Sequence, residues 1–470
     1  MTCRLLAFSM ALAAAGLTSC GGSQYAFPRD AAAVQVRPSP ASGTSNYIAH
    51  VVLIVQENRS FDNLFATFPG ADGATTGRFK SKTIPLHKAP LQEPCDFGHS
   101  RLGFLKDYND GKMNGFYSES GGPSCSKKDA GREPYQYVNP KQIAPYWEIA
   151  EQYVLADHLF QTQGSGSFTA HQDLIRGGTT IDQQQLESLV DFPDHGPWGC
   201  DAPAGTVTSL LVEMGQKLKL EYHKGPFPCS NDFPGSGSSY QTLRDLLDAR
   251  SISWKYYAPP LTTRGSGSLW NAFDMIYPVR YGPEWTENIS MPETNVFNDI
   301  SAGNLATVSW VIPELENSDH PSSDADDGPS WVADLVNAIG ESQYWNSTAI
   351  VIVWDDWGGF YDHEPPPFFD NWGGLGFRVP MMVVSPYARE TSSSQPGYVS
   401  HTQYEFGSIL KFIEDTWSLG SLGTTDARAT SILDCFDFTQ QPRAFRKIPA
   451  LRAAIYFEHE RPSGQPVDTQ

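Results

Sequence analysis

The chain has 470 residues, a formal net charge of −20 at pH 7, 18% charged residues and 12% aromatic residues. The many aromatic and few charged residues exclude an intrinsically disordered chain, and the length allows a large hydrophobic core. The negative charge argues against nucleic acid as a partner, because it supplies no positive field for phosphate backbones. A phosphate group can still bind locally, through a metal ion or a few fixed cations.

Residues 1–19 are predicted to be an export signal. Arg4 precedes an apolar run over 5–17, which is too short to span a membrane. The run leads into the sequence LTSCG, which resembles the lipobox of bacterial lipoproteins and makes Cys20 the expected lipid-bearing residue. An ordinary signal peptide cut near the same place is the alternative. Residues 20–46 are small, polar and proline-rich, as in a flexible tether. We therefore expect an exported protein, lipid-anchored at the periplasmic face or cell surface, or else secreted.

Apolar strands and amphipathic helices alternate along the rest of the chain. We expect strands over 50–56, 253–257, 305–312, 349–354 and 381–385, helices over 239–250, 331–339 and 405–417, and both types over 147–159. Residues 70–135 and 180–235 show little periodicity and are predicted to be irregular, loop-rich insertions. The alternation indicates an α/β sheet covered by helices on both faces, in which ligands bind at the carboxyl ends of the strands.

Five cysteines lie beyond the predicted lipid site: Cys95, Cys125, Cys200, Cys229 and Cys435. Disulfides are allowed in an exported protein, and pairs 95–125 and 200–229 would each close a loop-rich stretch and leave Cys435 over. The sequence does not determine this connectivity. None of the five has CxxC spacing, so a thiolate metal site is not expected.

Two fully apolar strands end on acidic residues. The first is followed by Glu57 and Asn58, and the second by Asp355 and Asp356. Carboxylates at the end of a buried strand repel one another and resist desolvation, and a divalent cation removes both costs. Three carboxylates and an amide oxygen suit Mg²⁺ or Ca²⁺ and are tolerable for Mn²⁺ or Zn²⁺. The alternative is that Glu57 pairs with Arg59 and the aspartate pair caps a turn.

The segment 161–171, QTQGSGSFTAH, offers candidate nucleophiles. It carries three hydroxyl groups, on Ser165, Ser167 and Thr169, and ends at His171. Its glycines let the backbone approach a ligand, and the helical pattern that follows would put a hydroxyl at a helix N-terminus, where an anionic intermediate is favoured. The alternative is a flexible loop, which is the ordinary role of such a sequence.

Four histidines lie on segments where a substrate could meet them. His99 lies in the first insertion, His320 follows the strand over 305–312, His363 follows the acidic strand, and His401 precedes the last helix. A histidine beyond the carboxyl end of a strand is a candidate for substrate contact, although most isolated histidines are structural.

Six sequence blocks together resemble a known family. HVVLIVQENRSFDNLFATFPG, KMNGF, DHP, WDDWGGFYDHEPPP, GFRVPMMVVSPYAR and HTQYEFGSILKFIED are similar, in this order, to blocks of the bacterial phosphoesterase family. This family joins phospholipase C enzymes with an acid phosphatase branch and belongs to the alkaline-phosphatase-like superfamily. The resemblance covers roughly residues 48–420. It implies a three-layer α/β/α sandwich with a mostly parallel central sheet and loop-rich insertions, within a catalytic domain over 47–470.

The resemblance also implies roles for individual residues. One divalent metal ion is expected on Glu57, Asn58, Asp355 and Asp356, with Ser167 as both a metal ligand and the nucleophile. His99 and His320 match histidines that contact the phosphoryl or leaving group, and His363 matches a histidine in the site or just behind it. The sequence Phe-Thr-Ala after Ser167 departs from the Pro-Asn of the family, so Ser165 and Thr169 remain alternatives. Arg59 is expected to brace the acidic residues.

The implied activity is hydrolysis of phosphate esters through a phosphoseryl intermediate. The Asp355-Asp356 pair resembles the acid phosphatase branch, and the chain ends about fifty residues after the last block, where phospholipase members often carry extra β domains. Both features favour phosphomonoesters, with phospholipid head groups, as in phospholipase C, as the alternative. A non-catalytic surface lipoprotein is a second alternative, favoured only by the altered segment after Ser167. The expected partners are a small phosphate ester or phospholipid, and a membrane only through the N-terminal lipid.

Overall fold

The computed structural model describes residues 43–119, 121, 125, 131–182, 186–214, 217–225, 229, 240–262, 265–323, 326–367, 374–392, 397–464 and 466–467. The predicted export signal, Cys20 and most of the predicted tether lie outside these residues. The described part begins with a 3₁₀ helix, η1 (Thr44–Asn46), which leads into the first strand. Within it, no helix is long and apolar enough to cross a membrane.

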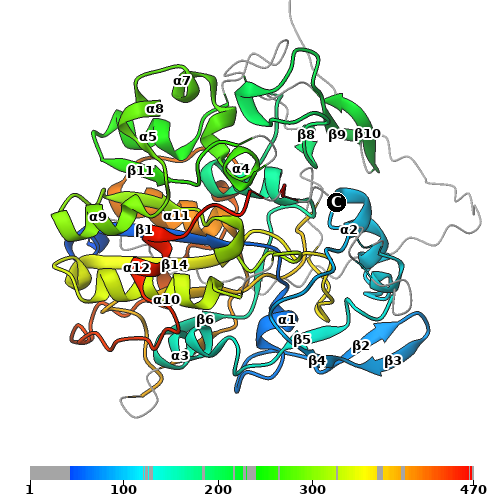
Figure 1. The fold of residues 1–470 in the computed structure, drawn as a ribbon, viewed down its shortest axis with the longest axis horizontal. Helices are drawn as coiled ribbons and strands as arrows, with labels where there is room; N and C mark the ends of the chain where they lie inside the picture. Colours follow the sequence, from blue (N-terminus) through cyan, green and yellow to red (C-terminus); the bar gives the residue numbers. More distant parts are fainter. Residues whose placement is uncertain are drawn as a thin grey trace, which may run out of the picture. The chain divides into compact units, whose positions relative to one another are not determined.

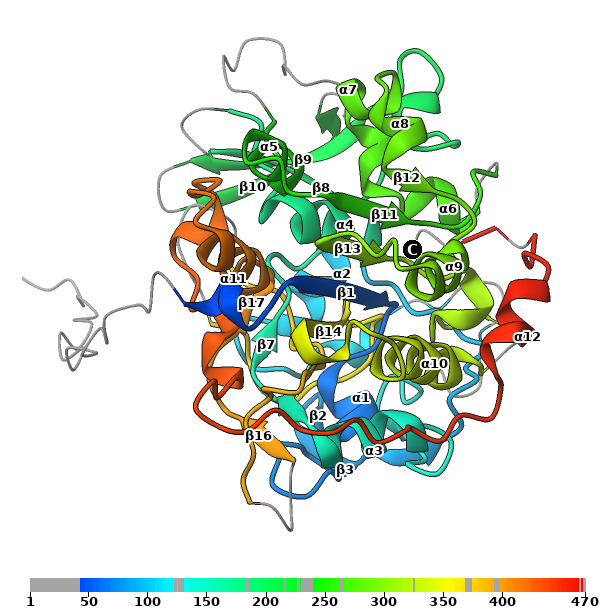
Figure 2. The ribbon, with the colours of Figure 1, turned by 90° about the vertical axis from the view of Figure 1, so that its left-hand side faces the viewer.

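A mixed, mostly parallel sheet of eight strands forms the centre of the fold (Figure 1). Its order is β12-β11-β13-β1-β14-β15-β6-β16. The bounds are β1 (His50–Gln56), β6 (Val154–Ala156), β11 (Trp254–Tyr257), β12 (Ile289–Ser290), β13 (Val308–Val311), β14 (Thr348–Trp354), β15 (Met381–Val384) and β16 (Tyr398–Ser400). The first five strands in this order are parallel to one another, and β15 is antiparallel to both β14 and β6. The five parallel strands therefore share one carboxyl edge (Figure 2).

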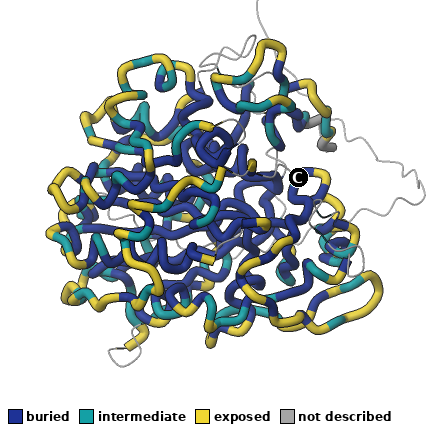
Figure 3. Tube along the Cα trace, in the orientation of Figure 1, coloured by how far each residue is buried: buried dark blue, intermediate teal, exposed yellow. Residues whose placement is uncertain are grey.

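Helices cover both faces of this sheet. Gln56 at the end of β1 donates a hydrogen bond to Tyr146 of α3 (Ala144–Gln152) and another to Gly328 of α10 (Gly328–Gly340). Trp310 of β13 is paired with Leu53 and so faces the other way, where it donates to the Leu174 carbonyl of α4 (Ser167–Arg176). The sheet thus lies between α3 and α10 on one side and α4 on the other, which confirms the predicted α/β class. In Figure 3 the buried residues gather in the interior and the exposed ones on the outer loops, and β1 and β14 are buried along nearly their whole length.

Most predicted elements are confirmed, with shifted ends. The strand predicted over 50–56 matches β1, and those over 253–257, 305–312, 349–354 and 381–385 match β11, β13, β14 and β15. The helix predicted over 239–250 begins later, because the side chains of Thr242 and Asp245 form a capping box at the start of α5 (Leu243–Ala249). The predicted helices over 331–339 and 405–417 match α10 and α11 (Phe406–Trp417).

The two segments predicted to be irregular contain regular structure, so that prediction was wrong in part. In the first insertion, β2 (Thr76–Phe79) and β3 (Lys82–Pro85) form a hairpin, β4 (His87–Ala89) pairs with β5 (Gln136–Val138), and α2 (Arg101–Tyr108) precedes η2 (Phe116–Ser118). In the second, β8 (Glu187–Val190), β9 (Thr208–Met214) and β10 (Lys217–Gly225) form an antiparallel sheet. The alternation of polar and apolar residues in KLKLEY was the missed signal, because a strand with one solvated face has this period.

The remaining elements are short. They are α1 (Phe61–Phe65), β7 (Leu159–Phe160), η3 (Gly199–Asp201), α6 (Ser266–Leu269), η4 (Ala272–Met275), α7 (Tyr277–Arg280), α8 (Glu284–Glu287), α9 (Asn295–Ala302), η5 (Leu315–Asn317), η6 (Trp345–Ser347), β17 (Tyr404–Glu405), η7 (Thr425–Ala427), η8 (Ile432–Cys435) and α12 (Ala454–His459).

Two disulfides join loop segments. Cys95 pairs with Cys125 and Cys200 pairs with Cys229, which confirms the pairing that loop closure favoured. Of the cysteines that the structure describes, Cys435 is buried and lies outside a disulfide.

Candidate active site

The alternation of side chains along β1 and β14 directs two carboxylates to one face of the sheet. Gln56 and Trp354 are paired across the two strands and face α3, where both contact Tyr146. The next residue of each strand, Glu57 and Asp355, therefore faces the opposite side. The backbone N–H of Asp355 still donates to the Gln56 carbonyl at 2.9 Å, so the ladder extends as far as these acidic residues.

Glu57 and Asp355 meet His171 of α4 on that face. His171 Nε2 lies 2.7 Å from Glu57 Oε1, and ligand atoms of all three buried residues lie within 4.8 Å of one another. Among the described residues, neither Glu57 Oε2 nor Asp355 Oδ2 has a hydrogen-bond partner, although both are buried. Burial, and then the charge of Asp355, raise the pKa of Glu57 well above its usual value, and burial lowers the pKa of His171 to about 4. Among the residues that the structure describes, no lysine or arginine forms an ion pair with Glu57 or Asp355, and a bound cation would stabilise such a group of acceptors.

Asn58 is held in an unusual backbone conformation. Its φ of 58° is left-handed, and its backbone N–H donates to Asp355 Oδ1 at 2.9 Å. Gly358 lies against the same backbone, because a Cβ atom there would come within 2.2 Å of the Asn58 carbonyl oxygen. Gly358 also has a positive φ of 57°, so glycine is required for conformation and for space. The close approach of the two acidic segments thus depends on this residue.

Ser167 is the first residue of α4, which follows Gly166 as N-cap. Its Oγ lies 3.1 Å from Asp356 Oδ2 and 3.4 Å from Asn58 Oδ1. Burial, and then the charge of Asp355, raise the pKa of Asp356 well above its usual value. The hydroxyl therefore lies at the N-terminus of a helix, beside the acidic residues from both strand ends.

The other two hydroxyls of this segment have different partners. Ser165 Oγ accepts the backbone N–H of Asp191 at 2.7 Å, and Thr169 Oγ1 donates to the Gly166 carbonyl at 3.1 Å. Both groups therefore stabilise local structure. Of the three hydroxyls, that of Ser167 lies beside the acidic residues, and its alignment with the family nucleophile stays a prediction.

Histidines 99 and 320 lie beside this site. His99 Nδ1 donates to the Phe97 carbonyl at 2.8 Å, which leaves Nε2 to accept the Asn58 amide at 3.0 Å. A Cβ atom at Gly166 would lie 3.5 Å from His99 Cδ2, so this ring borders the start of α4. The ring centroids of His99 and His320 are 6.4 Å apart. The structure thus brings both predicted histidines to the same site.

Trp270 lies between His171 and His320 and contacts both rings. Its ring stacks with that of His171 at a centroid distance of 6.3 Å and lies 5.8 Å from that of His320. The sequence placed His171 at the end of the candidate nucleophile segment, and the predicted metal ligands did not include it. Its spacing of four residues from Ser167 was the available signal, because such residues share one face of a helix.

Arg59 braces a loop, and not the acidic residues as predicted. Its nitrogen atoms donate to the Asp319 carbonyl at 2.9 Å, the Leu91 carbonyl at 2.8 Å and Asn63 Oδ1 at 3.2 Å. The guanidinium also lies over the ring of Phe360. Asp319 precedes His320, so Arg59 holds the loop that carries this histidine. The fixed geometry of guanidinium suits three separate acceptors.

His363 belongs to a second cluster. Its Nδ1 lies 2.8 Å from Asp62 Oδ2, and its Nε2 lies 3.4 Å from Asp72 Oδ1. Arg378 donates to Asp362 Oδ1 at 2.9 Å in the same cluster. Burial opposes protonation of His363, but the hydrogen bond and charge of Asp62 outweigh it and raise the pKa to about 9. This cluster therefore joins the segment after β1, which carries Asp62, to the segment after β14, which carries Asp362 and His363. The catalytic role of His363 stays a prediction.

His401, the fourth candidate histidine, belongs to a different group of residues from the one around Ser167. Its Nδ1 is 2.7 Å from Asp157 Oδ2, and Asp157 Oδ1 is 2.7 Å from His158 Nδ1. These three residues form another group of ligand atoms within 4.8 Å of one another. His401 is exposed, and its ring is held by the hydrogen bond to Asp157.

Comparison with known proteins assigns the chain to a family. It is 23% identical to non-hemolytic phospholipase C of Burkholderia pseudomallei over 93% of this chain and 65% of that protein. It is 26% identical to phospholipase C A of Mycobacterium tuberculosis over 91% of this chain and 85% of that protein. A solved structure described as a protein in the alkaline phosphatase superfamily from Vibrio parahaemolyticus aligns over 81% of this chain and 70% of its own, with 9% identity and a TM-score of 0.34. The model of the phosphoesterase family matches residues 48–420, and the chain belongs to this family.

Proposed function

We propose that this protein hydrolyses phosphoric esters, with Ser167 as the nucleophile. The observation that carries the proposal is the position of its hydroxyl, 3.1 Å from Asp356 Oδ2 at the first turn of α4. A hydroxyl beside a carboxylate can lose its proton to that group as it attacks phosphorus. The N-terminus of the helix supplies partial positive charge for the phosphoryl oxygens.

One divalent metal ion fits the same group of residues. Glu57, Asp355 and His171 would hold it, since two of their oxygen atoms are buried without hydrogen-bond partners among the described residues. The remaining predicted ligands are Asn58, Asp356 and Ser167, and the first two lie next to Ser167. A bound ion would supply positive charge for the nucleophile and for a phosphoryl oxygen. An imidazole nitrogen in the donor set favours Zn²⁺ or Mn²⁺ over Mg²⁺ and Ca²⁺.

The reaction would proceed in two steps, through a covalent intermediate on Ser167. Ser167 Oγ attacks phosphorus and displaces the alcohol, whose oxygen takes a proton from the protonated form of His320. His99 is less suited to this step, because its Nε2 accepts a hydrogen bond from the Asn58 amide. A water molecule then attacks the phosphoseryl intermediate and releases phosphate and the free hydroxyl. Asn58 is positioned to donate to a phosphoryl oxygen, because its side-chain amide already spans the space between Ser167 and His99.

Two substrate classes have separate support. The phospholipase C relatives favour a phospholipid head-group ester. The adjacent aspartates 355 and 356 favour a phosphomonoester, through their resemblance to the acid phosphatase branch. A non-catalytic binding protein is disfavoured, because a binding fold has no need of a hydroxyl beside buried carboxylates.

The test compares release of p-nitrophenol from p-nitrophenyl phosphate and from p-nitrophenyl phosphorylcholine, from pH 5 to 8, with and without chelator. Ser167→Ala is expected to abolish turnover, and Ser165→Ala serves as the matched control because its hydroxyl bonds Asp191 instead. Preference for the choline diester would identify a phospholipase C, and preference for the monoester a phosphatase. Turnover that survives in Ser167→Ala would contradict the assignment of Ser167 as the nucleophile. If the wild-type protein neither turns over these esters nor binds metal, the proposal that it is an enzyme would be wrong.

We also propose that the protein is exported and anchored through a lipid on Cys20. The support is the LTSCG sequence after a short apolar run. In cells, the wild-type chain is expected in the membrane fraction and Cys20→Ala in the soluble exported fraction. Equal membrane association of both would contradict the lipid site.

A further inference from the structure

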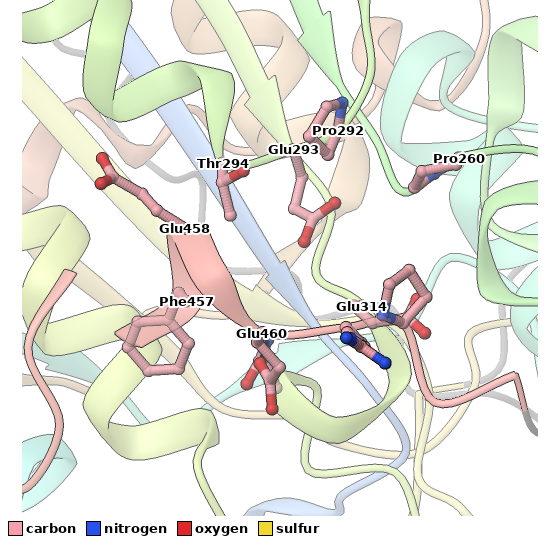
Figure 4. Close-up of a pocket in the computed structure, with 11 residues that line it drawn as sticks. Pro260, Pro292, Glu293, Thr294, Glu314, Phe457, Glu458 and Glu460 are labelled. Atoms are coloured by element: carbon pink, nitrogen blue, oxygen red, sulfur yellow. Dashed lines mark hydrogen bonds between the residues drawn. The ribbon is translucent and has the colours of Figure 1, made fainter. Parts of the chain in front are cut away.

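A pocket outside the candidate active site lies beyond the carboxyl ends of three outer strands. Pro260 follows β11, Pro292 and Glu293 follow β12, and Glu314 follows β13. The segment that ends α12 closes the pocket from another side, and the cavity has a volume of about 170 Å³ (Figure 4). Its lining contains none of the residues assigned to the candidate active site.

The lining carries much more negative than positive charge. Glu293, Glu314, Glu458 and Glu460 face a single guanidinium, that of Arg461, which is exposed. Glu314 and Glu460 are held in place by protein donors: Ser266 and Ser463 donate to Glu314, and Asn317 and Tyr456 donate to Glu460. These contacts hold two carboxylates at the pocket without neutralising their charge.

Two buried acceptors in the pocket lack protein donors. Glu293 is 5% exposed and Asn317 is 1% exposed. Among the described residues, Glu293 Oε2 and Asn317 Oδ1 have no hydrogen-bond partner. In Figure 4 the carboxylate of Glu293 points into the space between Glu314 and Glu460. Burial raises the pKa of Glu293 to about 8, and the charges of Glu314 and Glu460 add to this shift, while a hydrogen bond from its own backbone opposes it.

The pocket does not fit a small metal ion. The described residues contain four groups of three acidic or histidine residues with ligand atoms within 4.8 Å of one another, two of which share His363, and none includes a residue of this pocket. A metal cage needs its oxygen ligands close together, at 2.0–2.6 Å from one ion. Three proline rings, of Pro260, Pro292 and Pro462, also line the cavity and suit the carbon atoms of an organic ligand.

We propose that this pocket binds a small organic cation, an alkylammonium ion whose N–H groups donate to Glu293 Oε2 and Asn317 Oδ1. An ammonium group has three donors and no acceptor, so its N–H groups match the two buried acceptors that lack a donor among the described residues. A water molecule supplies donors but leaves the excess of carboxylates uncompensated. The proline rings pack against the aliphatic part of the ligand. The site is independent of the activity proposed above.

The test is isothermal titration of the full chain with n-butylammonium chloride. Its neutral counterpart n-butanol is expected to bind at least 10-fold more weakly, because it lacks the charge. Tetramethylammonium, which is charged but has no N–H donor, is also expected to bind at least 10-fold more weakly. Equal binding of either compound would overturn the proposal, as would the absence of saturable n-butylammonium binding or tighter binding of Ca²⁺ to the same pocket.

Variants locate the binding. Glu293→Gln, which removes the buried acceptor, is expected to weaken n-butylammonium binding at least 10-fold. Glu458→Lys reverses a charge on an exposed lining residue without disturbing the core, and should also weaken binding several-fold. Glu151→Gln, an exposed carboxylate on α3, is the matched control and should leave binding unchanged. Wild-type affinity in both pocket variants would overturn the proposal, because the cation would then bind elsewhere, including at the acidic residues beside Ser167.

Discussion

His171 Nε2 lies 2.7 Å from Glu57 Oε1, a contact between a helix and a strand end that are 114 residues apart in the sequence. The same helix begins with Ser167, so α4 brings a nitrogen ligand and a hydroxyl to the carboxylates at once. One helical turn separates these two residues, and both therefore reach the same side of α4.

Replacement of His171 should weaken metal binding. We expect His171→Ala to bind Zn²⁺ or Mn²⁺ at least about 10–100-fold more weakly than wild type, because loss of a residue that only supports a metal ligand already has an effect of this size. Metal content after dialysis against a buffered metal series measures the effect. His195→Ala removes an exposed imidazole and should retain wild-type affinity. Equal metal affinity in His171→Ala would exclude this residue from the site.

Gly358→Ala should lower the stability of the protein by more than the backbone strain at a positive φ alone would cause. The positive φ costs about 1–2 kcal/mol for any L-residue. The added Cβ would also lie 2.2 Å from the Asn58 carbonyl oxygen, so Asn58 must move. Gly423→Ala is the matched control, because it has a φ of 72° and no atom within 4 Å of the new Cβ. We expect chemical denaturation to show a larger loss of stability for Gly358→Ala, with metal binding reduced in that variant alone. Equal losses of stability in the two variants would contradict the close contact between Gly358 and the Asn58 carbonyl oxygen.

Arg59→Lys should destabilise the loop that carries His320. Lysine keeps the charge but cannot reach the Asp319, Leu91 and Asn63 acceptors together. Each lost hydrogen bond to a charged donor costs about 1.5–3 kcal/mol, so we expect a clear fall in the free energy of unfolding. Arg452→Lys, on a half-exposed guanidinium paired with Asp327, should change stability by less than about 1 kcal/mol. Similar effects at the two positions would refute the bracing role.

The ion pair between His363 and Asp62 should make stability depend on pH. The pKa of His363 is raised to about 9 in the folded protein, so the folded state binds a proton more tightly than the unfolded state does. Its contribution is complete below the unfolded value of about 6.5 and is lost as the pH rises towards 9.

With the side chain 24% exposed, we expect a loss of about 1–3 kcal/mol across this range. Urea denaturation of wild type and His363→Gln between pH 6 and 9.5 measures it. The two curves should converge as the pH rises. His459→Gln, an exposed histidine on α12, should follow the wild-type curve. Parallel wild-type and His363→Gln curves would contradict the shifted pKa.

Several features of this protein were readable from local sequence. Uninterrupted apolar runs predicted β1 and β14, because strands buried on both faces carry no polar positions. The acidic residues directly after both strands predicted one shared site, since parallel strands bring their carboxyl ends to one edge. Strand alternation then explains why Glu57 and Asp355 face the same side.

Other features depended on contacts between distant segments. Ser165, Ser167 and Thr169 are equivalent as hydroxyls in a flexible segment, and only the packing of α4 against the strand ends separates Ser167, beside Asp356, from the other two. Arg59 lies two residues from Glu57, yet its acceptors come from the loop at Asp319 and from Leu91.

The sequence by itself determined the strands, the acidic strand ends and the family of this protein, because these depend on composition and spacing within short segments. The tertiary structure alone decided which hydroxyl meets the carboxylates, that His171 joins them, and that Glu293 Oε2 has no donor among the residues that the structure describes. Each of these depends on side chains that meet across more than a hundred residues or across separate loops, and local propensity does not encode such meetings.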